Sequence, residues 1–153
     1  MINHSQIGSR NRDKGQELER WVVNTALAFG IDAFRCGQGQ SSPLFPFADA
    51  IVNEIGIECK NGKQVSNWIR AEKFVPNKIS NEMLRWFEQT PLVCVHGHKW
   101  NKEKETFLIT LNPEHLKPLE LNGPTIEKVG LYRVRYIEWL EAISEVSLLE
   151  QQP

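Results

Sequence analysis

The segment from Phe47 to Lys63 constrains most strongly what this chain can fold into. Two short apolar runs flank a turn expected at residues 53–56, and this pattern predicts a β-hairpin. Asp49, Glu58 and Lys60 place charges within these runs that an ordinary buried strand does not contain. Strand side chains alternate between the two faces of a sheet, so Glu58 and Lys60 share one face. The hairpin therefore predicts a polar site built into a sheet.

A two-residue loop at 54–55 would fix the register of this hairpin. Antiparallel pairing would then place Asp49 opposite Lys60 and Ile51 opposite Glu58, which brings the two carboxylates and the lysine to one patch. Anionic oxygen donors beside a lysine suit a divalent metal ion, an activated water and a phosphate. This segment therefore predicts a nuclease-like site.

The whole chain, residues 1–153, is expected to form a single domain, because its length and apolar content allow one well-buried core. No apolar run is long enough to span a bilayer, and the N-terminus lacks the basic and apolar regions of a signal peptide. The cysteines, Cys36, Cys59 and Cys94, include no close pair, which is typical of reduced thiols. We therefore expect a cytoplasmic protein with no membrane partner.

The formal net charge of −1 argues against a strongly basic nucleic-acid-binding protein. The charges are unevenly distributed, because basic residues outnumber acidic ones between residues 59 and 104 and acidic residues predominate from 105 to 153. A surface that faces phosphates, with another that faces away from them, would explain this distribution. A solvated surface of mixed charge explains it equally well.

The first helix is predicted from about Asp13 to Phe29, with Gly30 ending it. Glu19 lies at the border of its apolar stripe, where a carboxylate could reach over a sheet edge toward a site, although a surface position is the simpler interpretation. The stripe recurs at helical spacing and comprises Leu18, Trp21, Val22, Thr25, Ala26 and Phe29.

Residues 1–11 are expected to form a flexible polar arm. Arg10, Arg12 and Lys14 give the start of the chain three positive charges close to the predicted helix. Arms of this kind often contact phosphate backbones, although termini without a function are more common.

A strand is expected at residues 32–36, followed by a loop from Gly37 to Pro46 that is rich in glycine, serine and proline. This loop directly precedes the hairpin, so we expect it to lie over the site and to contact a substrate. It is not a nucleotide-binding P-loop, because no Gly-Lys-Ser/Thr follows the glycines.

The remainder of the chain predicts an alternation of strands and helices, and hence an α/β fold with a mixed sheet. A helix at residues 77–89 is expected to turn Met83, Leu84 and Phe87 inward. The other elements are strands at 64–69, 92–98, 106–111 and 131–135 (the last at a sheet edge), a charged turn at 99–104, a capped helical turn at 112–115 and a helix at 136–149.

Cys94, His96 and His98 alternate along one predicted strand and could suggest zinc. Three ligands on one strand converge poorly on a tetrahedral ion, so we expect a buried thiol and two partly exposed histidines instead. The tryptophans divide by context: two fall on apolar helix faces and are expected in the core, whereas two lie beside basic residues and could stack on bases, although packing is commoner. The former are Trp21 and Trp139, and the latter are Trp68 and Trp100.

Taken together, these motifs resemble the PD-(D/E)xK, or restriction-endonuclease-like, nuclease superfamily, and within it the archaeal-type Holliday junction resolvases and their phage relatives. The resemblance begins at Lys14–Arg20, which matches a Lys-Gly-x-x-x-Glu-Arg opening of the first helix. It continues through Phe34–Gly39, an apolar residue and arginine before a glycine-rich loop. It ends with Asp49, the Glu-x-Lys at Glu58–Lys60, and Lys63.

The resemblance implies a restriction-endonuclease-like core and a nuclease mechanism. Asp49 and Glu58 would bind the metal ion, Glu19 would complete the shell of metal and water, and Lys60 would position the attacking water or stabilise the phosphate. The metal would be Mg²⁺, with Mn²⁺ able to substitute. The DNA backbone would be held by Arg20, Arg35 and Lys63. The basic arm and the glycine-rich loop described above add further candidate DNA contacts, namely Arg10, Arg12, Lys14, Gln38, Gln40 and Ser41.

The resemblance further implies a homodimer that cuts four-way DNA junctions during recombination and repair, in the cytoplasm of a prokaryotic or phage-infected cell. The C-terminal helix, with Trp139 and Leu140, is a candidate for the dimer surface. Two alternatives remain open: a related nuclease that cuts other duplex or branched DNA, and a DNA-binding module without catalytic activity.

Overall fold

The computed structural model describes residues 4–37, 42–61, 79–96 and 101–151, without side chains for 4–15. Within these ranges, strands β1 to β6 form one sheet in the order in which they occur along the chain. The elements are α1 (His4–Ala28), β1 (Ala33–Arg35), β2 (Ala50–Val52), β3 (Ile55–Asn61), α3 (Asn81–Gln89), β4 (Leu92–His96), α4 (Lys102–Glu105), β5 (Thr106–Thr110), η1 (Pro113–Leu116), η2 (Glu127–Val129), β6 (Tyr132–Arg135) and α5 (Tyr136–Glu150).

The sheet is mixed, as the sequence predicted. β3 and β4 pair in parallel, and the other neighbouring strands pair antiparallel. A parallel pair needs a long connection that returns the chain to the same end of the sheet, and α3 lies within this connection. The strand predicted at residues 64–69 lies outside the described residues. β6 is an edge strand, as expected.

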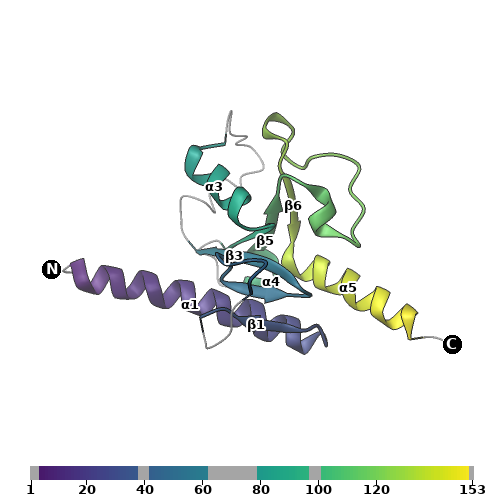
Figure 1. The fold of residues 1–153 in the computed structure, drawn as a ribbon, viewed down its shortest axis with the longest axis horizontal. Coiled ribbons are helices and arrows are strands. Elements are labelled where there is room, and N and C mark those ends of the chain that lie inside the picture. Colours follow the sequence, from purple (N-terminus) through teal and green to yellow (C-terminus); the bar gives the residue numbers. More distant parts are fainter. Residues whose placement is uncertain (1–3, 38–41, 62–78, 97–100, 152–153) are drawn as a thin grey trace.

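Helices cover both faces of the sheet (Figure 1). α1 and α5 pack on one face over the larger apolar cluster, which includes Ile57 and Cys59 of β3. α3 packs on the other face, over a smaller cluster centred on Trp86. Because side chains alternate along a strand, Gly56, Glu58 and Lys60 belong to the face covered by α3. We call this the α3 face.

The first helix starts at His4, earlier than the predicted Asp13, so residues 4–11 of the expected flexible polar arm are helical. Its predicted stripe is confirmed by the full burial of Leu18, Val22 and Ala26. The helix ends at Ala28, one residue before the predicted Phe29, and Gly30 follows in the left-handed conformation with a φ of 78°. None of the helices in the described chain is long and apolar enough to cross a membrane.

α3 begins later than predicted, at Asn81, with Ser80 as its N-cap. Met83 and Phe87 pack against the smaller cluster as expected, but Leu84 is exposed and Trp86 is buried in its place. The helical angle explains this difference. Around the helix axis, Met83 lies between Trp86 and Phe87, which are about 100° apart. Leu84 lies about 100° from Met83, on the side away from Trp86.

The C-terminal helix also differs from one expectation. Tyr136, Trp139, Leu140 and Ile143 face the sheet at helical spacing, and Trp139 and Leu140 have no exposed surface. The proposal that Trp139 and Leu140 form a dimer surface is therefore wrong, because both belong to the core of their own chain. The expectation that Trp139 is a core residue is confirmed, and Trp21 is partly buried beside the Tyr136 ring.

The predicted row of Cys94, His96 and His98 is only partly described, because His98 lies outside the described residues. Cys94 is buried as expected. His96 was expected to be partly exposed but is buried, with its Nδ1 3.0 Å from the hydroxyl of Thr106. Trp68 and Trp100 also lie outside the described residues. The end of the predicted charged turn forms the short helix α4.

Candidate active site

The hairpin turn lies at Asn53 and Glu54, one residue earlier than the loop that the sequence predicted at 54–55. Both residues have positive φ, 52° for Asn53 and 68° for Glu54. Two successive left-handed residues define the type I′ turn, whose twist matches that of a hairpin, and asparagine enters this conformation more readily than most residues.

This turn shifts the register of the hairpin. Ile51 pairs with Gly56, not with Glu58 as predicted. The predicted pairing of Asp49 with Lys60 is likewise wrong, because regular pairing ends before Asp49. The shift is by an even number of residues, so the alternation of faces that the prediction used is unchanged, and Glu58 and Lys60 still share one face.

Asp49 lies just before β2, at the end of the ladder between β2 and β3. Its Oδ2 accepts a hydrogen bond of 2.8 Å from the backbone N–H of Cys59. Its own N–H donates to the carbonyl of Ile57 at 2.9 Å, and its carbonyl accepts from the N–H of Cys36 at 3.0 Å. These three bonds fix the Asp49 carboxylate against the part of β3 that carries the Glu58–Lys60 motif.

Glu58 and Lys60 form an ion pair on the α3 face, with 3.1 Å between Oε1 and Nζ. The other carboxylate oxygen of Glu58 lies 3.4 Å from the hydroxyl of Thr90, the C-cap residue of α3. The Lys60 ammonium lies 5.0 Å from the centroid of the Trp86 ring, within the range of a cation–π interaction. α3 therefore holds both charged side chains of the motif.

Glu19 approaches the site from α1. Its Oε2 accepts a hydrogen bond of 3.1 Å from Nη2 of Arg35, the last residue of β1, and both side chains are largely buried. The Nε of Arg35 is also buried and has no hydrogen-bond partner among the described residues. The position of Glu19 at the border of the apolar stripe thus places its carboxylate in an ion pair at the end of β1.

Electrostatic interactions connect Asp49 with both of these groups. Burial raises the pKa of the Asp49 carboxyl, while the hydrogen bond from Cys59 and the positive charge of Lys60 oppose that rise. Burial also raises the pKa of Glu19; the bond from Arg35 opposes the rise, and the negative charge of Asp49 adds to it. Asp49 therefore lies within electrostatic range of both Glu19 and Lys60.

The described residues contain no group of three His, Cys, Asp or Glu side chains that is already placed to hold a metal ion. Glu19 is engaged by Arg35, and Glu58 is engaged by Lys60. The donor set is nevertheless chemically suited to Mg²⁺, because it consists of carboxylate oxygens. Burial disfavours the ionised form of two of these carboxylates, Glu19 and Asp49, and a bound cation would stabilise it.

The predicted DNA-binding residues are placed only in part. Arg20 is exposed on α1 and Arg35 is held by Glu19. Arg10, Arg12 and Lys14 lie in the N-terminal part of α1, whose side chains are not described. The others fall outside the described residues: Gln38, Gln40, Ser41 and Lys63.

The described part of the loop before the hairpin lies beside the site. Phe45 packs on Gly56, because a Cβ built at Gly56 would come within 2.6 Å of Cγ of Phe45. Gly56 is two residues before Glu58 on the same strand face, so Phe45 covers the α3 face next to that carboxylate. This agrees with the expectation that the loop lies over the site.

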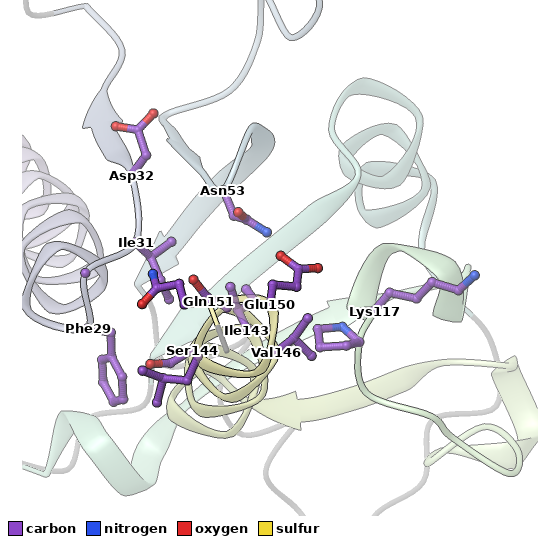
Figure 2. A pocket seen from close by; sticks show the side chains of 14 residues that line it. Phe29, Ile31, Asp32, Asn53, Lys117, Ile143, Ser144, Val146, Glu150 and Gln151 are labelled. Atoms are coloured by element: carbon purple, nitrogen blue, oxygen red, sulfur yellow. The ribbon is translucent and has the colours of Figure 1, made fainter. Parts of the chain in front are cut away.

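A cleft of about 540 Å³ lies elsewhere (Figure 2). It is bounded by the C-terminal half of α5, by the segment directly before β1 and by the hairpin turn. Asp32 and Asn53 line one side, and Lys117 lines another. Among the described residues, its lining shares no member with the Glu19, Asp49, Glu58 and Lys60 set. We therefore place the candidate site at the carboxylates and not in this cleft.

Comparisons with known proteins add no further identification. No family model matches the chain, and neither a curated protein nor a solved structure matches it. The candidate site accordingly depends on the geometry of its own residues.

Two residues of the site were not predicted. Thr90 and Trp86 hold the Glu58–Lys60 motif from α3, across a segment of the chain that contains no recognisable motif. The helical spacing of Met83, Trp86 and Phe87 could have indicated Trp86 as an inward-facing residue. No pattern in the sequence pointed to Thr90, because its position depends on where α3 ends and how it packs on β3.

Proposed function

We propose that this protein is a metal-dependent DNA endonuclease that acts on branched DNA, of the Holliday junction resolvase type, and that works as a homodimer. The observation that carries the proposal is the position of Asp49. Its carboxylate is fixed against the backbone of the Glu-x-Lys strand, and it interacts electrostatically with both Glu19 and Lys60. Four-way junctions and dimerisation come from the sequence resemblance.

The side chains suit phosphodiester hydrolysis. Asp49 and Glu58 would bind the metal ion, with Glu19 completing its surroundings. Lys60 carries a positive charge beside Glu58, where it can stabilise a phosphate whose negative charge increases during attack. When bound, Mg²⁺ would activate a water molecule and offset charge on the phosphate. Arg35 lies next to Glu19 and is bound to it, and the resemblance assigns this arginine to the DNA backbone.

A second candidate is a DNA-binding module that retains these residues without cleaving DNA. The ion pairs of Glu19 with Arg35 and of Glu58 with Lys60 favour this candidate, because each occupies a carboxylate that a metal would need. For cleavage, the metal must compete with these pairs. Burial makes that exchange feasible at Glu19, whose charge is already unfavourable despite Arg35.

The decisive experiment compares a synthetic four-way junction with a linear duplex of matched sequence, each incubated with the protein and Mg²⁺. We expect paired incisions in the junction and little cutting of the duplex. Asp49→Asn is expected to abolish incision while retaining binding, because asparagine keeps the oxygen that accepts from Cys59 but loses the charge.

Four outcomes would change the proposal. Equal cutting of both DNAs would exclude a junction-selective enzyme and favour a general nuclease. Full activity of Asp49→Asn would exclude the metal site. Binding of the junction without any incision, at any Mg²⁺ or Mn²⁺ concentration, would favour the non-catalytic module. A monomeric mass in solution at working concentration would contradict paired incision by a dimer.

A further inference from the structure

The loop directly before Asp49 carries two strongly exposed apolar side chains. Leu44 is 82% exposed and Phe47 is 61% exposed. Single exposed apolar residues are common on protein surfaces and need no explanation. This pair is different in its placement, because Phe47 is two residues from a carboxylate of the proposed active site.

Two consecutive turns present these side chains. The N–H of Phe45 donates to the carbonyl of Ser42, and the N–H of Ala48 donates to the carbonyl of Phe45, each at 3.2 Å. Both bonds span the four residues of a β-turn. Leu44 and Phe47 therefore occupy the same position, the third, in successive turns.

Prolines make both turns rigid. Pro43 and Pro46 are the second residues of the two turns, where the fixed φ of proline matches the turn geometry. Phe45, which belongs to both turns, packs on Gly56 and attaches the loop to β3. The loop thus fixes the exposed side chains before any partner binds, so that contacting one costs little conformational entropy.

The loop is attached to the same strand face as the proposed catalytic residues. Phe45 covers Gly56, and Glu58 and Lys60 follow on that face of β3. Two residues of chain span at most about 7 Å, so the backbone of Phe47 is no farther from the backbone of Asp49 than about the length of one nucleotide. A DNA strand whose phosphate reached the carboxylates would bring a base next to this loop.

We propose that Leu44 and Phe47 form a base-contacting surface, on which the Phe47 ring stacks against a nucleobase exposed beside the cleaved phosphodiester. The inference rests on the proposed nuclease function and specifies its substrate. An aromatic ring can stack on a base only where the base is free of its neighbour, as at a branch point or in a single strand. Bases inside a regular duplex are already stacked, so this surface selects DNA with an interrupted stack.

The test uses a four-way junction with 2-aminopurine at the branch point, and measures its fluorescence and the Kd without divalent metal, so that the DNA stays intact. We expect wild-type binding to change the fluorescence. Phe47→Ala should lose most of that change and raise the junction Kd roughly tenfold, the usual cost of losing one stacked base. Phe47→Trp should behave as wild type and Phe47→Leu as the alanine variant, because the stacking needs a ring.

The chain supplies a matched control for the other residue. Leu149 is 65% exposed on α5 and is the same residue type as Leu44. Leu44→Ala is expected to raise the junction Kd, and Leu149→Ala to leave it unchanged. Binding of a linear duplex should not respond to any of these variants.

Unchanged junction binding and fluorescence in Phe47→Ala would overturn the inference. If Phe47→Ala gave this result while the wild type cut DNA in an Asp49-dependent way, the proposed nuclease activity would be supported and only the base contact would be refuted. A wild type that neither binds nor cuts any DNA would refute both. A change of oligomeric state in Phe47→Ala, without a change in DNA binding per protomer, would show that a second copy of the chain covers the loop and would also refute the inference.

Discussion

The packing of Phe45 on Gly56 leads to a prediction whose sign can be decided. Replacing glycine by alanine in a strand normally stabilises a protein by about 0.4–1 kcal/mol where the backbone permits it, because the unfolded chain loses freedom. Gly56 permits it, since its φ is outside the left-handed region. The three atoms nearest to its added methyl group all belong to the Phe45 side chain.

The contacts are too close for that methyl group. Its carbon would lie 2.6 Å from Cγ, 2.7 Å from Cβ and 3.1 Å from Cδ1 of Phe45. These atoms are at the base of the side chain, so the ring cannot avoid the clash by rotating, and the loop must move. Overpacking of this kind costs about 1–3 kcal/mol. We therefore expect Gly56→Ala to lower the free energy of unfolding by about 1–2 kcal/mol net, which lowers the melting temperature by several degrees.

A double-mutant cycle measures this clash directly. In a Phe45→Gly background all three of these atoms are gone, so Gly56→Ala should become neutral or stabilising, with a coupling energy of about 2 kcal/mol between the two sites. The assay is urea unfolding followed by tryptophan fluorescence, with thermal unfolding as a second measurement. Stabilisation by Gly56→Ala in the wild-type background, or equal effects in both backgrounds, would refute the packing of Phe45 on β3.

Three further predictions test other parts of the structure. Thr90→Val should reduce DNA cleavage several-fold, because it removes the hydroxyl that lies 3.4 Å from Glu58 and 3.1 Å from the carbonyl of Trp86, and Thr90→Ser should restore it, as measured by single-turnover kinetics at saturating Mg²⁺. Asp49→Asn should melt at a higher temperature than wild type in metal-free buffer at pH 7; burial raises the pKa of this carboxyl, so its ionised form costs stability above that pKa, and the difference should shrink as the pH falls through it. Tyr136→Phe should lower the free energy of unfolding by about 0.5–1.5 kcal/mol, seen in the urea midpoint, because the buried hydroxyl donates to the carbonyl of Val22.

The elements of the fold could be predicted where sequence periodicity is strong. The stripe on α1, the strands β4 and β5 and the closing helix α5 all follow from apolar spacing, since burial against the sheet is what selects their residues. Boundaries were less accurate. The start of α1 at His4 was missed because Asp13 was taken as the N-cap, whereas it lies inside the helix.

The register of the hairpin shows what local pattern alone cannot fix. Gly56 suggested a turn, because glycine favours one, but it lies in β3, where it makes room for Phe45. The turn is formed by Asn53 and Glu54, and glutamate is an unusual residue for a left-handed position. A glycine required by a distant side chain is indistinguishable in sequence from a glycine required by a turn.

The site was predicted from residues that belong to short sequence motifs, and the structure shows how residues on different elements can be brought together. A sheet separates the side chains of its two faces, so Glu19 on α1 and the Glu58–Lys60 pair on the α3 face could not meet across a continuous sheet. Asp49 lies where the regular pairing of β2 with β3 ends, directly before the pair of Ala50 with Ile57. There its carboxylate accepts the N–H of Cys59, and it interacts electrostatically with both Glu19 and Lys60. One aspartate thus combines a bond to the backbone of β3 with a charge that acts on both of these groups. Removing its charge and removing its hydrogen bond are therefore separable changes, and a site of this design depends on both.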